Sequence, residues 1–372
     1  MTSPKRTAGF FDTCTRDLKA EDLQRLFTRD TREAYRFFTR HVDTEAFRLL
    51  PWYRRLWAHV RVLFMAFTMK LSPARRVVYG ASLLLAALAL ANLAQAGSHG
   101  VVFPDGTGLF IVAFALMNLL VLLEVADRLS LKNDLEIARE IQVAMLPDAV
   151  YEAPGVETFG LSRPANTVGG DFYDIVPLAD GRVAIAVGDV AGKGSPAALL
   201  MALLLAMMRT LLDERLEPAE LVARLNVQVT RHAPGSRFIT LFYGVFDPAT
   251  GVLTFVNAGH TPPLLLRRDA AVERLTDGGI ALGMFDGSTY LTGRAMLAAG
   301  DLLAIYSDGI TEAENPAGKP FDEQGLESAL RVNRPASLSA VGAGIVQAVE
   351  RHTADTRLAD DLTILLLRRS GA

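Results

Sequence analysis

Long uncharged runs and short alternating runs divide the chain into two halves. Residues 77–96 contain no charged side chain, and residues 109–126 contain only one, Glu124, near their end. Each run is close to the roughly 20 residues that cross the apolar core of a bilayer. Beyond Pro147 the apolar runs become short and are bounded by Gly, Asp, Asn and Pro. The pattern predicts two membrane-spanning helices, followed by a domain of strands and helices.

The charges around the two apolar runs predict their orientation. The connection 97–108 has no Lys or Arg, whereas basic residues flank the outer ends of both runs: Arg54, Arg55, Arg61, Lys70, Arg75, Arg76, Arg128 and Lys132. The positive-inside rule places both termini and the later domain in the cytoplasm. We therefore expect a protein of the cytoplasmic membrane with two spans. A buried helical hairpin in a soluble domain is the alternative, and the first run begins too far from Met1 for a signal peptide.

Residues 1–72 are expected to form a cytoplasmic helical region, and residues 73–126 the two spans. Within the first region, 12–46 has apolar residues at helical spacing and no assignable chemistry. Residues 47–71 mix tryptophan and tyrosine with arginine, which predicts an amphipathic helix at the membrane surface.

Residues 127–147 are expected to form a connector helix that ends at Pro147. Apolar residues alternate at spacings of four and three in a short coiled-coil seam with one polar position: Leu131, Leu135, Ala138, Gln142 and Met145. The seam predicts a homodimer, with Gln142 able to fix its register. The connector could transmit motion from the membrane or act only as a spacer that also dimerises.

The remaining residues, 148–372, alternate strand-like runs with helical stretches. Strands are predicted at 183–187, 238–246, 252–256, 264–266, 302–306 and 362–367. Helices are predicted at 196–212, 220–232 and 338–352. The first of these helices is strongly apolar, but it carries Arg209 and only 17 residues, so we expect it to be buried against a sheet rather than to form a third span.

Composition adds two constraints to this picture. Half of the residues are hydrophobic and 21% are charged, so disorder is excluded as the dominant state. The single cysteine, Cys14, excludes a disulfide framework and a cysteine-based zinc site. Residues 1–146 carry 19 Lys and Arg against 14 Asp and Glu, whereas residues 147–372 carry 19 against 27. The net charges of +5 and −8 fit a basic half at a membrane and an acidic half with a different task.

Aspartates recur where predicted strands meet glycine-rich turns. They are Asp171 and Asp174 in VGGDFYD, Asp189 after VAIAVG, Asp308 after LLAIYS, and the pair Asp360–Asp361 before the last strand. Each alone is most often a turn residue, but together their hard oxygens could hold magnesium or manganese. The segment GDVAGKG does not match a phosphate-binding P-loop, because its glycines are one residue too close and Gly194 replaces the required Ser or Thr.

Seven motifs in this half, in this order, resemble one known family. They are LEIAREIQVAMLP, VGGDFYD, VGDVAGKGSPAALLMA, FITLFYGVFD, NAGHTPPLLLR, YSDGITEAENPAGKPF and DDLTILLLR. They are similar to the SpoIIE/RsbU-type bacterial protein serine/threonine phosphatases of the metal-dependent PPM superfamily, from about Leu135 to Arg369. The resemblance implies an α+β fold, a four-layer αββα sandwich of two antiparallel sheets, here preceded by the two-span hairpin and the coiled-coil connector. It also implies that the connector is a regulatory helix.

The resemblance implies two divalent cations, manganese or magnesium, and assigns residues to them. Asp189 would bridge both ions, with the Val190 carbonyl and Asp171 on one side and with Asp308 and Asp360 on the other. Asp189, Asp308 and Asp360 would thus be the catalytic residues, Asp361 would lie in an outer shell, and Asp174 would be an outer-shell or a structural residue. Two cations lower the pKa of a shared water and offset charge on the phosphate.

Two residues of the eukaryotic relatives are missing from this pattern. Val190 and Ala191 follow the bridging aspartate where those relatives carry a histidine, so the acid for the leaving group is unassigned. His260 could be that acid or a structural turn residue. Those relatives also carry an arginine near the N-terminal edge for the phosphate; here Arg163 could contact phosphate or be solvated. Such a bare site suggests recognition by surface docking.

The implied substrate is a phosphorylated STAS-domain anti-anti-sigma factor in a partner-switching pathway, with no nucleic-acid partner. Two other functions stay open: a non-catalytic phosphoprotein-binding scaffold of the same fold and a hydrolase of small phosphates. The four aspartates at ligand positions disfavour the scaffold, and the absence of a phosphate-cradling glycine loop disfavours the small-phosphate hydrolase.

Overall fold

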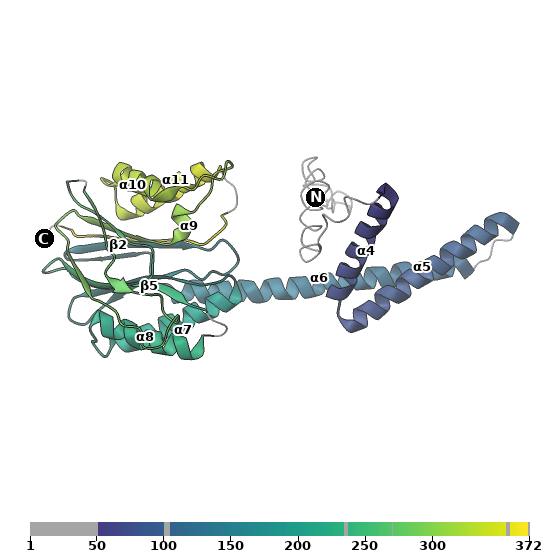
Figure 1. The fold of residues 1–372 in the computed structure, drawn as a ribbon, viewed down its shortest axis with the longest axis horizontal. Coiled ribbons are helices and arrows are strands. Elements are labelled where there is room, and N and C mark those ends of the chain that lie inside the picture. The colour runs from purple at the N-terminus through teal and green to yellow at the C-terminus, as the bar shows by residue number, and fades with distance from the viewer. Residues whose placement is uncertain (1–50, 100–104, 234–236, 270, 355–357, 371–372) are drawn as a thin grey trace, which may run out of the picture. The chain divides into compact units, whose positions relative to one another are not determined.

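The computed structural model describes residues 51–99, 105–233, 237–269, 271–354 and 358–370. The predicted module at 12–46 and the first residues of the predicted amphipathic helix lie outside them. The chain divides into two compact units, Met1–Leu129 and Ser130–Ala372, each of which is described by itself (Figure 1).

The described part of the first unit is helical. It contains α4 (Trp52–Lys70), α5 (Pro73–His99) and the first part of α6 (Asp105–Met145). Near the start of α5, the Arg75 guanidinium donates to Glu124 Oε2 at 3.3 Å and lies 2.8 Å from Asp127 Oδ2. The start of α5 therefore lies beside the end of the apolar run of α6, as an antiparallel hairpin requires.

The apolar residues of this hairpin are mostly exposed. The buried positions in α5 and α6 include the small residues Ser82, Ala89 and Ala113, which allow helices to approach closely. By length and composition α5 and α6 could each cross a membrane, and so could α7 (Ser195–Leu212) of the second unit. About 11% of the α5 and α6 windows is buried, against 33% for α7. The location of the hairpin in a membrane therefore stays a prediction.

The second unit contains two six-stranded sheets. The first has the order β1 (Val150–Ala153), β2 (Val156–Arg163), β12 (Leu362–Arg368), β11 (Leu302–Tyr306), β7 (Leu264–Leu266) and β8 (Val272–Arg274). The second has the order β10 (Gly293–Met296), β6 (Val252–Ala258), β5 (Ile239–Asp247), β4 (Val183–Val190) and β3 (Phe172–Pro177). All neighbours in these orders are antiparallel, and the two-residue β9 (Gly278–Gly279) adds one parallel pairing to β6.

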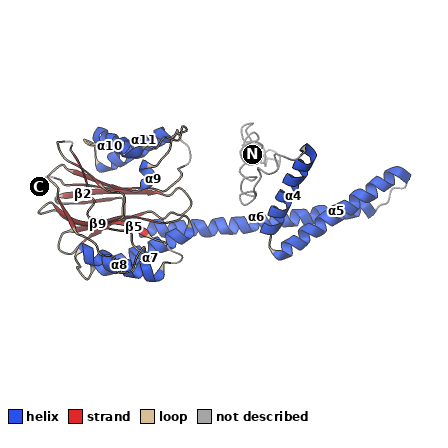
Figure 2. Cartoon of the chain, viewed as in Figure 1, coloured by secondary structure: helices blue, strands red, loops and turns tan. Residues whose placement is uncertain are grey.

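Helices cover the outer face of each sheet, so the domain has four layers (Figure 2). Alternating side chains of β4 separate two cores: Val183, Ile185 and Val187 pack between the sheets, and Ala184 and Ala186 pack under α7 and α8 (Pro218–His232). A third core lies under α10 (Asp322–Asn333) and α11 (Leu338–Thr353), next to the short α9 (Asp308–Thr311). The predicted αββα sandwich is confirmed.

The apolar helix α7 is part of this domain, as the sequence predicted. Leu200, Met201, Leu204, Leu205 and Met208 are buried in the core on the second sheet. Its three- and four-residue spacing of buried leucine and methionine explains why so apolar a helix forms here without being a membrane span. The six predicted strands are all present, while β1, β2, β3, β8, β9 and β10 were not predicted.

Candidate metal centre

The candidate aspartates gather at one end of the two sheets. Asp171 immediately precedes β3, and the register Phe172↔Gly188 places it beside Asp189 at the end of β4. Asp308 begins α9 just after β11, and Asp360 and Asp361 immediately precede β12. Because β11 and β12 are antiparallel neighbours with Tyr306↔Ile364, these last residues also meet at one end of a sheet. The topology thus brings together residues up to 190 positions apart.

Asp171 and Asp189 form the buried side of this acidic centre. Asp171 is 3% exposed, and its Oδ2 is buried with no hydrogen-bond partner. Burial, and then the charge of Asp189, raises the pKa of Asp171 well above its ordinary value. Burial, and then the charge of Asp308, raises the pKa of Asp189 to about 6. An unpartnered buried carboxylate oxygen is costly, and a bound cation would remove that cost.

The backbone beside these carboxylates is packed too closely for any side chain. A Cβ on Gly170 would lie 2.9 Å from the Val190 carbonyl oxygen and 3.2 Å from Asp189 Oδ1. A Cβ on Gly169 would lie 2.1 Å from Asp361 Oδ2. The glycine pair of VGGDFYD therefore lets the loop approach the Val190 carbonyl and the carboxylates directly.

Asp361 organises the loop that carries Asp171. Its carboxylate accepts hydrogen bonds from the backbone N–H groups of Ala165 and Gly170, both at 2.8 Å, and of Asp171 at 3.4 Å. The side chain is nearly buried, and its oxygens are occupied by these donors. Asp361 thus fits the outer-shell role that the resemblance implied for it.

Asp308 and Asp360 form the exposed side of the centre. The Asp360 side chain is 49% exposed, and its Oδ2 lies 2.8 Å from the ammonium of Lys193. Lys193 also donates to the Ala359 carbonyl at 2.8 Å. Burial, and then the charge of Asp360, raises the pKa of Asp308. Carboxylates that repel one another in this way favour a cation between them.

The residues present fit hard divalent cations. The donors are carboxylates and one backbone carbonyl, which suit magnesium or manganese better than zinc or copper. Within the described residues, no three His, Cys, Asp or Glu side chains are already grouped closely enough to hold a metal ion, so the fit rests on the chemistry of the donors and on the unpartnered Asp171 oxygen.

His260 lies behind the acidic centre. It is buried, its backbone N–H donates to Asn257 Oδ1 at 2.7 Å, and its Nδ1 lies 3.0 Å from the Thr240 hydroxyl, opposite Asp189 in the β4–β5 register. Burial lowers the pKa of His260 to about 4, so the imidazole is neutral at physiological pH. These contacts favour the structural alternative over proton donation to a leaving group.

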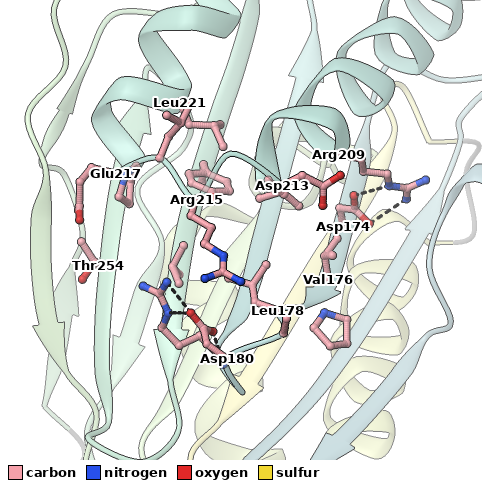
Figure 3. Close-up of a pocket in the computed structure, with 18 of the residues that line it drawn as sticks. Asp174, Val176, Leu178, Asp180, Arg209, Asp213, Arg215, Glu217, Leu221 and Thr254 are labelled. Carbon is pink, nitrogen blue, oxygen red and sulfur yellow. Dashed lines mark hydrogen bonds and ion pairs between the residues drawn. The ribbon is translucent and has the colours of Figure 1, made fainter.

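Asp174 points away from the centre and has a different task. It is 1% exposed and forms a bidentate ion pair with Arg209, with Nε at 2.8 Å and Nη2 at 2.9 Å (Figure 3). Arg209 also donates to the Met145 carbonyl at the end of α6. The pair lines a cavity of about 790 Å³ on the outer face of the second sheet, together with Pro147 and Tyr243. Asp174 is therefore structural.

The connector is bonded to the loop that carries Asp171. The Gln142 side chain is buried, its Nε2 donates to the Gly169 carbonyl at 2.9 Å, and its Oε1 accepts from the Gly169 N–H at 3.2 Å. The seam pattern suggested that Gln142 fixes the register of a dimer, but the structure gives its amide a partner in its own chain. Leu135, Ala138 and Met145 of the same seam are half-buried.

Two basic residues, Arg163 and Lys193, make contacts that the sequence did not predict. Arg163, a candidate for phosphate binding, forms an ion pair with Glu350. Lys193 was considered only as part of the mismatched P-loop, yet it reaches the acidic centre. Its place four residues after Asp189, between two glycines, was the available signal.

Solved structures of other proteins share this fold. The second unit superposes on the SiaA-PP2C domain of Pseudomonas aeruginosa with a TM-score of 0.57 and 25% identity, covering 65% of this chain and 98% of that one. The RsbU and RsbW domains of a Mycobacterium tuberculosis protein give a TM-score of 0.50 and 27% identity, covering 58% and 60%. The fold and site thus define a PP2C-type phosphatase domain, a class of metal-dependent enzymes.

The family model "Stage II sporulation protein E (SpoIIE)" matches residues 179–370, just over half of the chain. The chain belongs to this SpoIIE family. It is 29% identical over 240 residues to the phosphoserine phosphatase RsbU of Bacillus subtilis, covering 64% of this chain and 71% of RsbU. It is also 29% identical over 274 residues to the protein IcfG of Synechocystis, covering 66% of this chain and 43% of IcfG.

Proposed function

We propose that this protein is a membrane-anchored, metal-dependent protein serine/threonine phosphatase. The observation that carries the proposal is the convergence of Asp171, Asp189, Asp308 and Asp360 at one end of the sandwich, with a buried Asp171 oxygen that has no partner. Two relatives with matching sequences are named phosphoserine phosphatases, RsbU and RsbP of Bacillus subtilis.

In this proposal Asp171, Asp189 and the Val190 carbonyl hold one cation, and Asp189, Asp308 and Asp360 hold the other. Bound divalent cations supply a water of lowered pKa and offset the charge of the phosphate in the transition state. The chain's own part is to hold the carboxylates in position. Asp361 does so through the backbone of the Asp171 loop, and Gly170 leaves room for the Val190 carbonyl.

We propose a phosphorylated STAS-domain protein as the substrate, in a partner-switching pathway. The support is the family resemblance and the names of the phosphoserine phosphatase relatives. A folded substrate also suits a centre whose Asp360 side is half exposed at the protein surface.

The test uses full-length protein in detergent micelles, a phosphoserine-loaded STAS protein and manganese. We expect phosphate release that stops with EDTA and is restored by manganese. Asp189→Asn should abolish release, whereas Asp213→Asn, the same change at the exposed end of α7, should leave it unchanged. Binding of the phosphoprotein without release would identify a scaffold, and release only from small phosphate esters would identify a small-phosphate hydrolase.

We propose further that α5 and the first part of α6 span the bacterial inner membrane, with both termini and the catalytic domain in the cytoplasm. The Arg75 contacts with Glu124 and Asp127 bring the two basic flanks of the hairpin to the same side. Because Cys14 is the only cysteine, a Cys14→Ser background allows single-site labelling. An impermeant maleimide should label Ser98→Cys on intact cells, but Ser130→Cys only after permeabilisation. The reverse pattern, or a protein soluble without detergent, would contradict this topology.

The connector is proposed to regulate the centre as a homodimer. Its half-buried seam residues Leu135 and Ala138 are available for a second copy, and Gln142 bonds the same helix to the Asp171 loop. Cross-linking of Leu135→Cys in a Cys14→Ser background tests the dimer, with the exposed Glu136→Cys as the control for random contact.

A further inference from the structure

Lys193 links two segments that carry candidate ligands. It lies in the loop between β4, which ends after Asp189, and α7. Its ammonium donates to Asp360 Oδ2 and to the Ala359 carbonyl, both at 2.8 Å. Gly192 and Gly194 have φ values of +110° and +75°, so a loop that L side chains rarely adopt directs this lysine to the centre.

The contact places a cation on a carboxylate that a metal ion would also use. Two cations cannot both be the close partner of the same Asp360 oxygen without repelling each other. The Lys193 side chain is 53% exposed, and its four-carbon stem is flexible, so the ammonium is free to turn into solvent while the loop stays in place. The ammonium would then remain within a few ångströms of the centre, at its open side.

A phosphomonoester entering that side is doubly negative and needs a positive partner besides the metal ions. Arg163 is already paired with Glu350, away from this role. A lysine binds phosphate as a flexible point charge, without the fixed geometry of arginine. Lys193 is therefore placed to be that positive partner.

We propose that Lys193 is a substrate-holding cation that exchanges partners: it neutralises Asp360 when the centre is metal-free and binds a phosphate oxygen when the centre is loaded. This inference rests on the proposed phosphatase function. Lys193 should therefore have two opposite effects on the centre: it weakens the binding of metal and strengthens the binding of phosphate.

The experiment compares Lys193→Met, Lys193→Arg and a charge-matched control, Arg294→Met, in the full-length protein. Arg294 is exposed on β10, paired in register with Thr254 and remote from the acidic end. Calorimetry with manganese alone should give a Kd about threefold lower for Lys193→Met, because a competing cation is gone. Inorganic phosphate should bind the manganese-loaded Lys193→Met protein about tenfold more weakly, and Lys193→Arg should restore most of that affinity.

The steady-state counterpart is a KM for the phosphoprotein about tenfold higher in Lys193→Met, with a smaller change in kcat. Lys193→Met values equal to those of Arg294→Met in both calorimetric measurements would overturn the inference. Tighter metal binding with unchanged phosphate binding would overturn the substrate-holding role. If the wild-type protein releases no phosphate at all, the proposed function fails, while the two calorimetric measurements still decide the role of Lys193.

Discussion

Asp171 and Asp360 lie on opposite sides of the acidic centre, and the protein surrounds the two carboxylates differently. Asp171 is buried, one of its oxygens has no partner, and the backbone of its loop is fixed by Asp361 and Gln142. Asp360 is half exposed, and its partner is a flexible lysine. The Asp171 side is held by hydrogen bonds and has a carboxylate oxygen without a partner. The Asp360 side already has a positive partner, the flexible Lys193.

Under the proposals above, regulation by the connector acts on the Asp171 side and the substrate approaches the Asp360 side. Gln142 bonds only to the loop of the buried side, so a shift of the connector would move Asp171 before it moved Asp360. The exposed side is the one that a folded substrate can reach. The comparison predicts that substitutions on the two sides differ in size and in their response to added metal.

The largest effect on activity is expected from substitution of the two proposed metal ligands, Asp171 and Asp360. Asp171→Asn should lower phosphate release by at least about 10³-fold, or about 4 kcal/mol, because a neutral amide leaves a buried cation site without its charge. Asp360→Asn should cost less, and millimolar manganese should restore part of it. Activity against manganese concentration measures both. Equal losses with equal rescue would remove the distinction between the sides.

The next effect concerns stability and uses two adjacent residues. Asp361→Ala should lower the free energy of unfolding by about 4 kcal/mol, because the N–H groups of half-buried Ala165 and buried Gly170 lose a charged acceptor. Asp360→Ala should change it by no more than about 0.5 kcal/mol, since its ion pair is half exposed. Urea denaturation of the metal-free proteins measures the difference. Similar losses in both variants would show that Asp361 does not organise the buried side.

The sequence predicted several strands of the two sheets and the aspartates of the centre better than it predicted the hydrogen bonds around those aspartates. Asp189 and Asp308 follow apolar runs that form β4 and β11, so local pattern located them. The strands β2 and β3, with sequences VETFGLSR and FYDIVP, are too polar or too interrupted to stand out. Neighbouring strands bury them regardless of their own pattern.

The bonds that distinguish the two sides have no local signal at all. Gln142 and Gly169 are 27 residues apart, and Lys193 and Asp360 are 167 apart. The Lys193–Asp360 pair forms because strands β4 and β12 of the two sheets meet at one end, and the Gln142–Gly169 pair forms because the end of α6 contacts the loop before β3. The spacing of Gln142 is that of a helix seam, and spacing alone cannot tell a dimer contact from a bond within the chain. For the same reason Asp361 could be ranked behind Asp360 only by resemblance.

A pH measurement tests whether His260, like Asp171, is shielded from water in the folded protein. The folded pKa of His260, about 4, is below the unfolded value of about 6.5. His260 therefore favours the folded state fully above pH 6.5, and this contribution, about 3 kcal/mol, is lost as the pH falls towards 4. The raised pKa of Asp189 acts with the opposite sign, because its contribution is present at low pH and lost as the pH rises through about 6.

Comparison of wild type with His260→Gln isolates the histidine, because the aspartates are common to both. Metal-free unfolding between pH 7 and 4.5 should show a steeper loss for the wild type. Parallel curves would mean that His260 takes up its proton over the same pH range in the folded and unfolded protein, as an imidazole open to water would.

The smallest effect on activity is expected from a substitution in the connector, and it should act only on the Asp171 side of the centre. Gln142→Leu removes both hydrogen bonds to Gly169 and puts an apolar side chain of similar size in place of the amide, at a cost of about 1–2 kcal/mol. Phosphate release at limiting manganese should fall about tenfold and recover at saturating manganese, because the Asp171 loop loses alignment and not its charge. Glu140→Gln, an exposed change on the same helix, should have no effect. A loss that saturating manganese does not restore would place the connector's influence on the exposed side, with Asp360 and Lys193.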